Sequence, residues 1–213
     1  TAYAIRLSLV GSEMCIRDRI SKEFRERYLS NPKHPNVFKG KAVVFEGPED
    51  YHHRINSKKL KIDENSILII RGCGPVGYPG SAEVVNMQPP DRLLKKGINA
   101  LPTLGDGRQS GTSESPSILH VSPESAVGGD LAIVKTGDKM TIDLNKRRVD
   151  LQISKSEFIK RRKKKKIKKL TNQTPWQEIS RSNVGQLEDG ACIMSRDQYL
   201  DITKTKGVLR NSH

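Results

Sequence analysis

Short apolar runs alternate with polar, charged segments along the first half of the chain. Apolar runs of this length, bounded by Gly, Pro or polar residues, are typical of buried strands. They predict strands at 42–46, 66–71 and 98–104.

Helices are predicted before and between these strands. Residues 20–29 have helical composition and end at a segment with two prolines, and a second helix is expected around Tyr51. A third covers 91–96, with Asp91 as its predicted N-cap and Gly97 as its terminator.

The second half of the chain is rich in β-prone residues. Strands are predicted at 118–121, 131–135, 139–144 and 148–153. Turn signals separate the last three, which is the pattern of a small meander. The signature Ser-Lys-Ser-Glu predicts the start of a helix over 154–170, and a final helix is expected at 196–203. The order of elements predicts an α/β fold with a barrel-like mixed sheet flanked by helices.

The positive charge of the chain is unevenly distributed. The 213 residues carry a formal net charge of +14, and much of the excess lies in the block 160–169. That block predicts either a nucleic-acid-binding surface or the solvated face of a helix. No aromatic residues interleave with it to stack on bases, so we favour the helix. Its buried stripe is expected to be Phe158, Ile159, Ile167 and Leu170. A non-catalytic basic module that binds RNA or DNA stays as the alternative.

Composition sets two further bounds. With 34% hydrophobic residues, the chain can bury one sizeable core. No apolar run approaches the ~20 residues that span a bilayer, so we expect a soluble, cytoplasmic protein without a membrane partner.

Cysteines and histidines indicate little chemistry. The three cysteines are far apart and form no pair at metal spacing, so Cys73 and Cys192 are expected to be small buried residues. His52 and His53 are adjacent and point apart on a helix, so they are not expected to hold one ion together. His120 is expected to be a core residue of a strand.

Two Gly-rich segments, 71–83 and 105–113, each follow an apolar run. Backbone this free to bend often approaches a ligand closely. The first segment contains Gly-Cys-Gly-Pro-Val-Gly at 72–77, a literal match to the dinucleotide-binding pattern. Pro75 and Pro79 oppose the helix that must open inside such a motif, so we interpret the match as a decoy.

Each Gly-rich segment carries one residue suited to chemistry. Ser110 follows a strand end, where the backbone amides of a turn can stabilise an oxyanion. A serine hydroxyl is a very weak acid, so it can act as a base only if a nearby cation lowers its pKa. Glu83 supplies a carboxylate in the first segment.

Several short motifs follow one another from about residue 20 to the end. They are Phe45–His52, Arg71–Gly80, Glu83–Met87, Gly105–Ser113, Ser122–Glu124, Gly128–Gly129, Thr136–Asp138, Thr174–Glu178 and Val184–Leu187. In this order they resemble the C-terminal part of the dihydroxy-acid and sugar-acid dehydratases. Phe45–His52 and Gln109–Ser113 are closer to the aldonate branch, such as arabinonate or xylonate dehydratase. The dihydroxy-acid dehydratase of branched-chain amino-acid synthesis stays as an alternative.

That resemblance implies a hydro-lyase that removes water from a 2,3-dihydroxy acid, a small-molecule sugar acid, to give a 2-keto-3-deoxy acid. The family uses an iron–sulfur cluster as Lewis acid on the C3 hydroxyl, and Mg²⁺ to hold the carboxylate and the C2 oxygen. By motif match, Ser110 is the base that takes the C2 proton and Glu83 is a magnesium ligand. Thr112 contacts the substrate or orients the serine. The implied fold is the swivelling β/β/α domain of the family.

The resemblance also implies a missing part. In this family the cluster cysteines and the remaining magnesium ligands lie in an N-terminal domain, and neither Cys73 nor Cys192 matches a cluster position. We therefore expect the chain alone to be inactive, and the full-length enzyme to be a homo-oligomer. Glu114 stands where the family commonly has a small residue.

Residues 9–18 resemble a translated sequencing adapter. The expected organisation is an adapter-like, disordered segment over 1–19, a helix and linker over 20–36, the mixed-sheet domain over 37–155 and a helical extension over 156–213.

Overall fold

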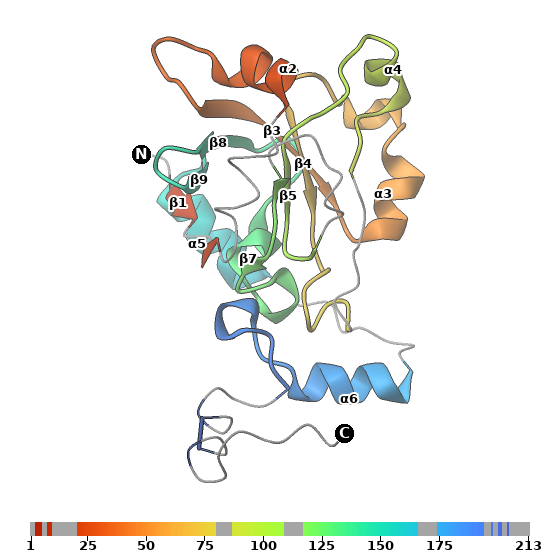
Figure 1. The fold of residues 1–213 in the computed structure, drawn as a ribbon, viewed down its shortest axis with the longest axis vertical. Helices are drawn as coiled ribbons and strands as arrows, with labels where there is room; N and C mark the ends of the chain where they lie inside the picture. The colour runs from red at the N-terminus through yellow and green to blue at the C-terminus, as the bar shows by residue number, and fades with distance from the viewer. Residues whose placement is uncertain are drawn as a thin grey trace.

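The computed structural model describes residues 3–5, 8–9, 21–79, 87–108, 117–165, 174–193, 197, 200, 201 and 204. Seven of their strands form a mixed sheet in the order β1-β9-β8-β3-β4-β5-β6, curled into a half-barrel with helices around it (Figure 1). The strands are β1 (Tyr3–Ile5), β3 (Val37–Phe45), β4 (Ser66–Ile70), β5 (Thr103–Gly105), β6 (Ser117–Ile118), β8 (Lys139–Asp143) and β9 (Arg148–Leu151). A separate antiparallel pair is β2 (Ser8–Leu9) with β7 (Val121–Ser122). The α/β mixed-sheet fold that the sequence predicts is confirmed.

Strand direction places three loops at one edge of the sheet. β3, β4, β5 and β6 run parallel, whereas β8 pairs antiparallel with both β3 and β9. Ile70 at the end of β4 lies opposite Phe45 and Gly105, the last residues of β3 and β5. The segments that follow these three strands therefore start side by side.

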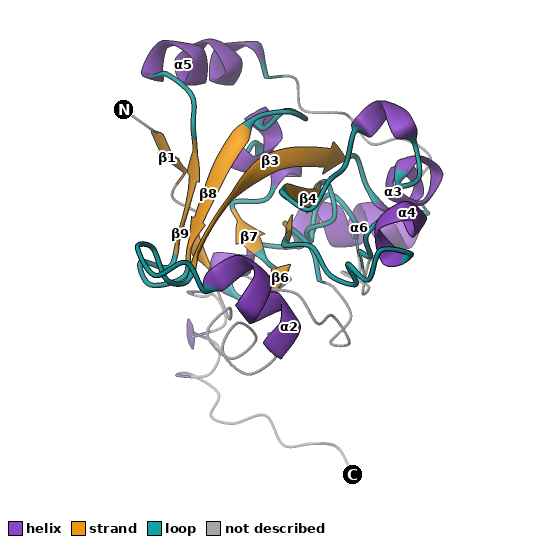
Figure 2. Cartoon of the chain, turned by 90° about the horizontal axis from the view of Figure 1, so that it is seen from above, coloured by secondary structure: helices purple, strands orange, loops and turns teal. Residues whose placement is uncertain are grey.

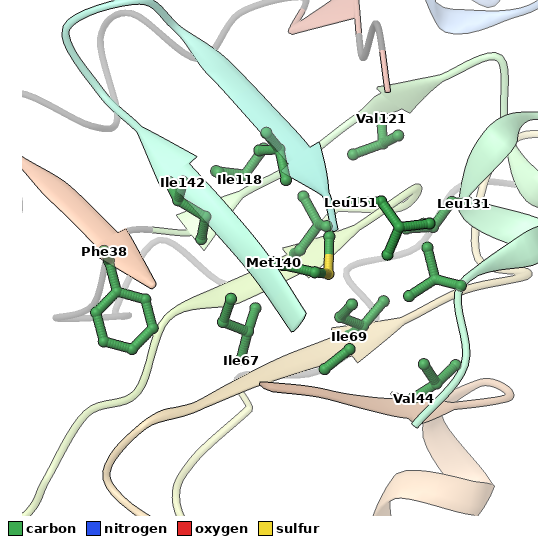
Figure 3. Packing of buried hydrophobic residues seen from close by; sticks show 14 of the residues in the cluster. Phe38, Val44, Ile67, Ile69, Ile118, Val121, Leu131, Met140, Ile142 and Leu151 are labelled. Carbon is green, nitrogen blue, oxygen red and sulfur yellow. The ribbon is translucent and has the colours of Figure 1, made fainter. Parts of the chain in front are cut away.

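Both faces of the central strands are buried, because alternate residues enter two different apolar clusters. Val44 and Ile69 face the inside of the half-barrel, with residues of the β8–β9 hairpin (Figure 3). Phe45 and Ile70 enter the other cluster, which includes residues of α3 (Pro48–Arg54) and α4 (Asp91–Leu94). Burial on both sides explains why these strands read as continuous apolar runs.

Helices flank the sheet on several sides. Phe158 of α5 (Lys155–Lys164) and Leu29 of η1 (Arg25–Leu29) belong to the inner cluster. Figure 2 shows α5 and α2 (Lys22–Phe24) at opposite margins of the curled sheet, with α3 and α4 together on one side. The remaining helical segments are η2 (Lys58–Leu60), η3 (Ser125–Val127), η4 (Asp130–Ile133), α6 (Pro175–Asn183) and η5 (Leu187–Asp189). Among the described residues, no helix has the length and apolar character that crossing a bilayer requires.

Local signals predicted several helix ends. Gly97 has φ +74° and closes the turn after α4. The Ser154 hydroxyl accepts the Glu157 N–H at 3.2 Å and caps α5 as predicted. Asp91 is not the cap of α4. Pro90 occupies that position without a side-chain bond, and the side chain of the distant Asn56 accepts the Asp91 N–H at 2.9 Å.

Other elements differ from the prediction. The apolar run predicted as a strand at 131–135 overlaps the 3₁₀ helix η4 (Asp130–Ile133), so the meander reduces to the β8–β9 hairpin. Helix α6 lies within the helical extension expected over 156–213, but its bounds were not predicted, although Thr174 and Gln177 form a capping box at its start. The helix predicted at 196–203 lies largely outside the described residues.

Within the segment 1–19, for which disorder stays a prediction, residues 3–5 and 8–9 are described as two short strands. β1 and β2 pair antiparallel with β9 and β7. β1 covers the side of β9 that faces away from β8, where the backbone N–H and C=O groups of β9 would otherwise lack partners. That residues 1–19 are foreign to the natural protein stays a prediction.

Candidate functional site

The two Gly-rich segments leave the sheet next to each other, at the carboxyl edge of parallel strands. Ile70 ends β4 and lies opposite Gly105, which ends β5. The first segment is described over 71–79 and the second over 105–108. The carboxyl ends of parallel strands are the usual ligand sites of open α/β sheets. This edge is therefore the candidate site.

Asp106 joins the bases of the two segments. Its side chain is fully buried, and its carboxylate accepts the backbone N–H groups of Gly72 at 3.0 Å and Cys73 at 2.9 Å. It also accepts the N–H and the hydroxyl of Ser125, at 2.8 and 2.5 Å. These donors replace the water that burial removes from the carboxylate. The second segment thus holds the backbone of the first.

Gly107 allows the two segments to touch. A Cβ at position 107 would lie 2.5 Å from the carbonyl oxygen of Cys73 and 2.7 Å from its Cβ, so a larger residue does not fit. Cys73 is fully buried, and burial raises the pKa of its thiol far above the ordinary value, with a smaller contribution from the charge of Asp106. The prediction that Cys73 is a small buried residue is confirmed.

Glu124 holds the next part of the first segment. Its carboxylate accepts the N–H groups of Val76 at 2.9 Å and Gly77 at 2.8 Å. The side-chain amide of Gln186 donates to the same carboxylate, and its oxygen accepts the Glu124 N–H, both at 2.9 Å. Burial raises the pKa of Glu124, opposed by these hydrogen bonds. Arg181 of α6 donates to the carbonyl of Val76 at 3.0 Å, so the region around α6 also fixes this segment.

Arg71 anchors the start of the first segment. Its Nη1 donates to the carbonyls of Leu131, Ala132 and Val134 at 3.1, 3.0 and 2.9 Å. Its Nε donates to the carboxylate of Glu46 at 3.0 Å. These carbonyl bonds hold the backbone of η4 in a turn, which explains why this apolar run is not a strand.

The dinucleotide-like pattern at 72–77 does not open a helix. The Tyr78 N–H donates to the Gly74 carbonyl at 2.7 Å and closes a turn. The N–H groups of Val76 and Gly77 are bonded to Glu124, so they do not form a pyrophosphate cradle. The expectation that no helix opens inside the pattern is confirmed.

The residues singled out in the second halves of these segments lie outside the described residues: Glu83, Ser110, Thr112 and Glu114. What the structure brings together is the bases of the segments that carry them. Sequence reasoning assigned no role to Asp106 or Glu124. The available signal was a carboxylate beside glycine or proline at a bend, a residue type that commonly binds backbone N–H groups.

The described cysteines do not fit an iron–sulfur cluster, which needs several thiolates together. Cys73 is enclosed between the two segments, and Cys192 lies alone on the surface. The prediction that Cys192 is buried is wrong, because the turn after η5 carries it outward. Among the described residues no group of three or more His, Cys, Asp or Glu could hold a metal ion. A cluster would need ligands from outside the described residues.

The histidines are peripheral. His120 is not a core residue of a strand but lies half-buried between β6 and β7, with φ +56°. Burial, with a smaller effect of Arg108, lowers its pKa. His52 and His53 are both exposed on α3.

The described part of the basic block belongs to α5. Phe158 is buried as predicted, but Ile159 is 43% exposed and lies outside the buried stripe. Arg161 is largely buried, and it pairs with Asp138 at 2.5 Å and with Glu157 at 2.7 Å. Ile167 and Leu170 lie outside the described residues. Binding of a nucleic acid by this block stays the alternative prediction.

Comparison with known proteins gives a consistent set of matches. The family model for the C-terminal region of dihydroxy-acid and 6-phosphogluconate dehydratases matches residues 29–191. A D-xylonate dehydratase of Caulobacter vibrioides is 54% identical over 183 residues, 86% of this chain and 31% of that protein. An L-arabinonate dehydratase of Rhizobium leguminosarum is 51% identical over 128 residues, 60% of this chain and 22% of that protein. A dihydroxy-acid dehydratase of Thermodesulfovibrio yellowstonii is 38% identical over 73% of this chain and 28% of that protein. The chain thus spans a third or less of the length of these curated relatives.

Proposed function

The chain belongs to the dihydroxy-acid/6-phosphogluconate dehydratase family, and we propose that it forms the C-terminal part of a hydro-lyase acting on a sugar acid. The reaction would convert a 2,3-dihydroxy acid to a 2-keto-3-deoxy acid. The identity with the D-xylonate dehydratase, which extends over most of this chain, carries the proposal. The lower identity with the dihydroxy-acid dehydratase makes branched-chain acids the second candidate substrates.

Three residues would act directly in this reaction. Ser110 would take the proton from C2, Glu83 would bind magnesium, and Thr112 would orient the serine or the substrate. The contact between the bases of their segments, through Asp106 and Gly107, supports their convergence on one site. Because the described cysteines do not fit a cluster, an iron–sulfur cofactor would be held by the rest of the dehydratase.

The remaining parts of the proposal concern the whole enzyme. Its cytoplasmic location, its assembly as a homo-oligomer and the inactivity of this chain alone stay predictions from the sequence. The N-terminal domain of the dehydratase is the partner that the proposal requires.

A chimera tests the proposal. The matched 31% of the Caulobacter D-xylonate dehydratase is replaced by the matching 183 residues of this chain. We expect the chimera to convert D-xylonate to a 2-keto-3-deoxy acid, detected as the keto product. L-arabinonate and 2,3-dihydroxyisovalerate, assayed in parallel, separate the aldonate branch from the branched-chain one.

Two variants make the result specific. Ser110→Ala should abolish turnover of the chimera, since it removes the proposed base. Ser156→Ala, at an exposed position of α5, serves as the matched control and should leave turnover unchanged. Equal turnover by the Ser110→Ala and unsubstituted chimeras would contradict the role of Ser110, and a folded but inactive unsubstituted chimera would contradict the proposed function.

A further inference from the structure

We propose that Asp106 and Glu124 are positioning residues, which hold the segment carrying Glu83 in register with the segment carrying Ser110. The catalytic consequence rests on the proposed function. The structural part, a carboxylate clamp on the backbone of residues 72–77, does not.

Asp106 acts at the base of both segments. It lies four positions before Ser110 in the chain, and it accepts the backbone N–H groups of Gly72 and Cys73 from the neighbouring segment. Any displacement of this carboxylate therefore moves the start of one segment relative to the other. Ser125 completes the clamp, because its hydroxyl donates to Asp106 and accepts the Gly72 N–H at 2.8 Å.

Glu124 acts further along the first segment. Its two carboxylate oxygens accept consecutive N–H groups, those of Val76 and Gly77. The approach is close, since a Cβ at Gly74 would lie 2.5 Å from Oε2 of Glu124. Because Glu124 and Ser125 are neighbours, a single short stretch of backbone sets both halves of the clamp.

The clamp fixes the backbone over residues 72–77, the described part of the segment that carries Glu83. Both carboxylates are fully buried, and most of their described hydrogen bonds are accepted from backbone N–H groups. This geometry constrains the path of the chain whatever side chains it carries. A misplacement of about 1 Å at a reacting group can reduce turnover about 100-fold. The two carboxylates thus have a role in catalysis without contacting the substrate.

Hydrogen exchange on the complete 213-residue chain tests the clamp itself. The variants are Asp106→Asn and Glu124→Gln, each of which turns an amide N–H₂ toward backbone donors. Asp150→Asn is the matched control, a buried carboxylate on β9 that pairs with Arg148. We expect exchange at least tenfold faster at residues 72–73 in the first variant and at 76–77 in the second. The control should leave these amides unchanged.

Turnover of D-xylonate by the chimera tests the catalytic consequence. Asp106→Asn should lower kcat about 100-fold with KM changed less than threefold. Asp150→Asn should leave kcat within twofold of the unsubstituted chimera, when each variant is assayed equally far below its own melting temperature. If Asp106→Asn prevents folding, Ser125→Ala replaces it, with faster exchange expected at Gly72 and a smaller loss of kcat.

The outcomes separate the two ideas. Unchanged exchange at 72–77 in the variants would overturn the clamp. Faster exchange with wild-type kcat in an active chimera would show that the clamp does not position the site, and would overturn the proposal. An inactive unsubstituted chimera would instead refute the proposed function together with the catalytic half of this inference, while the exchange result still decides the structural half.

Discussion

Arg71 offers the sharpest test of how the first Gly-rich segment is anchored. In Arg71→Met, the three carbonyls of η4 and the segment after it lose their donor. Nη1 carries two hydrogens, and a hydrogen bond to a charged group contributes about 1.5–3 kcal/mol. Two such bonds would contribute at most about 3–6 kcal/mol to the free energy of unfolding. Water that binds the freed carbonyls in the variant reduces this cost. Glu46 is more than half exposed, so its ion pair adds at most about 1 kcal/mol. We expect Arg71→Met to lower the free energy of unfolding by about 3 kcal/mol.

Arg71→Lys separates the charge from the geometry of the guanidinium. A lysine keeps the charge but has one flexible ammonium in place of a planar fork, so it should recover about half of the loss. Urea unfolding followed by far-UV circular dichroism measures both variants. Fluorescence is a poor probe, because Trp176 is 79% exposed. Arg25→Met, at an exposed position of η1, is the control and should change stability by less than about 0.5 kcal/mol.

Two results would refute this reasoning. If Arg71→Met costs no more than Arg25→Met, the carbonyl bonds contribute nothing to stability. If Arg71→Lys is as stable as the wild type, the charge matters and the fork does not.

Two further predictions concern the core and acid stability. Ile69→Ala should lower the free energy of unfolding in urea by about 2–5 kcal/mol, because Ile69 is fully buried. The control Ile179→Ala, at a residue 53% exposed, should lower it by less than about 0.5 kcal/mol. Equal losses in the two variants would contradict the packing of Ile69. The hydrogen bonds from Arg54, above all, lower the pKa of Asp50. This interaction therefore stabilises the fold above the unfolded-state pKa, about 4, and is lost as pH falls through the folded-state value. Unfolding between pH 5 and 2 should show a smaller loss of stability for Asp50→Asn than for the wild type, and parallel curves would exclude the effect.

The sequence predicted those elements whose cause is local. The strands at 42–46 and 66–71 are buried on both faces, so their apolar runs were unambiguous. β3 begins earlier, at Val37, because its first residues pair with β8, about 100 positions away. The strand expected at 131–135 failed for a similar reason, since the guanidinium that binds its carbonyls lies 60 residues earlier.

The same distinction applies to the candidate site. The Gly-rich segments and the order of the motifs pointed to Glu83 and Ser110, which stay predictions. The signal at Asp106 and Glu124, a carboxylate at a bend, could not identify their partners, which lie 33 and 48 positions away. A carboxylate that binds backbone N–H groups leaves no mark on the side chains of its partners.

The position of β3 in the sheet also has a consequence for synthesis on the ribosome. Val37 pairs with Asp143, so 106 residues (143 − 37) separate the two partners. At about 5–20 residues per second, one side of β3 stays without its neighbour for about 5–20 s after it is made. During that interval it presents an open row of N–H and C=O groups to other nascent chains. The arrival of the β8–β9 hairpin therefore sets when the sheet can close, and its delay sets how long the newborn chain is exposed to aggregation.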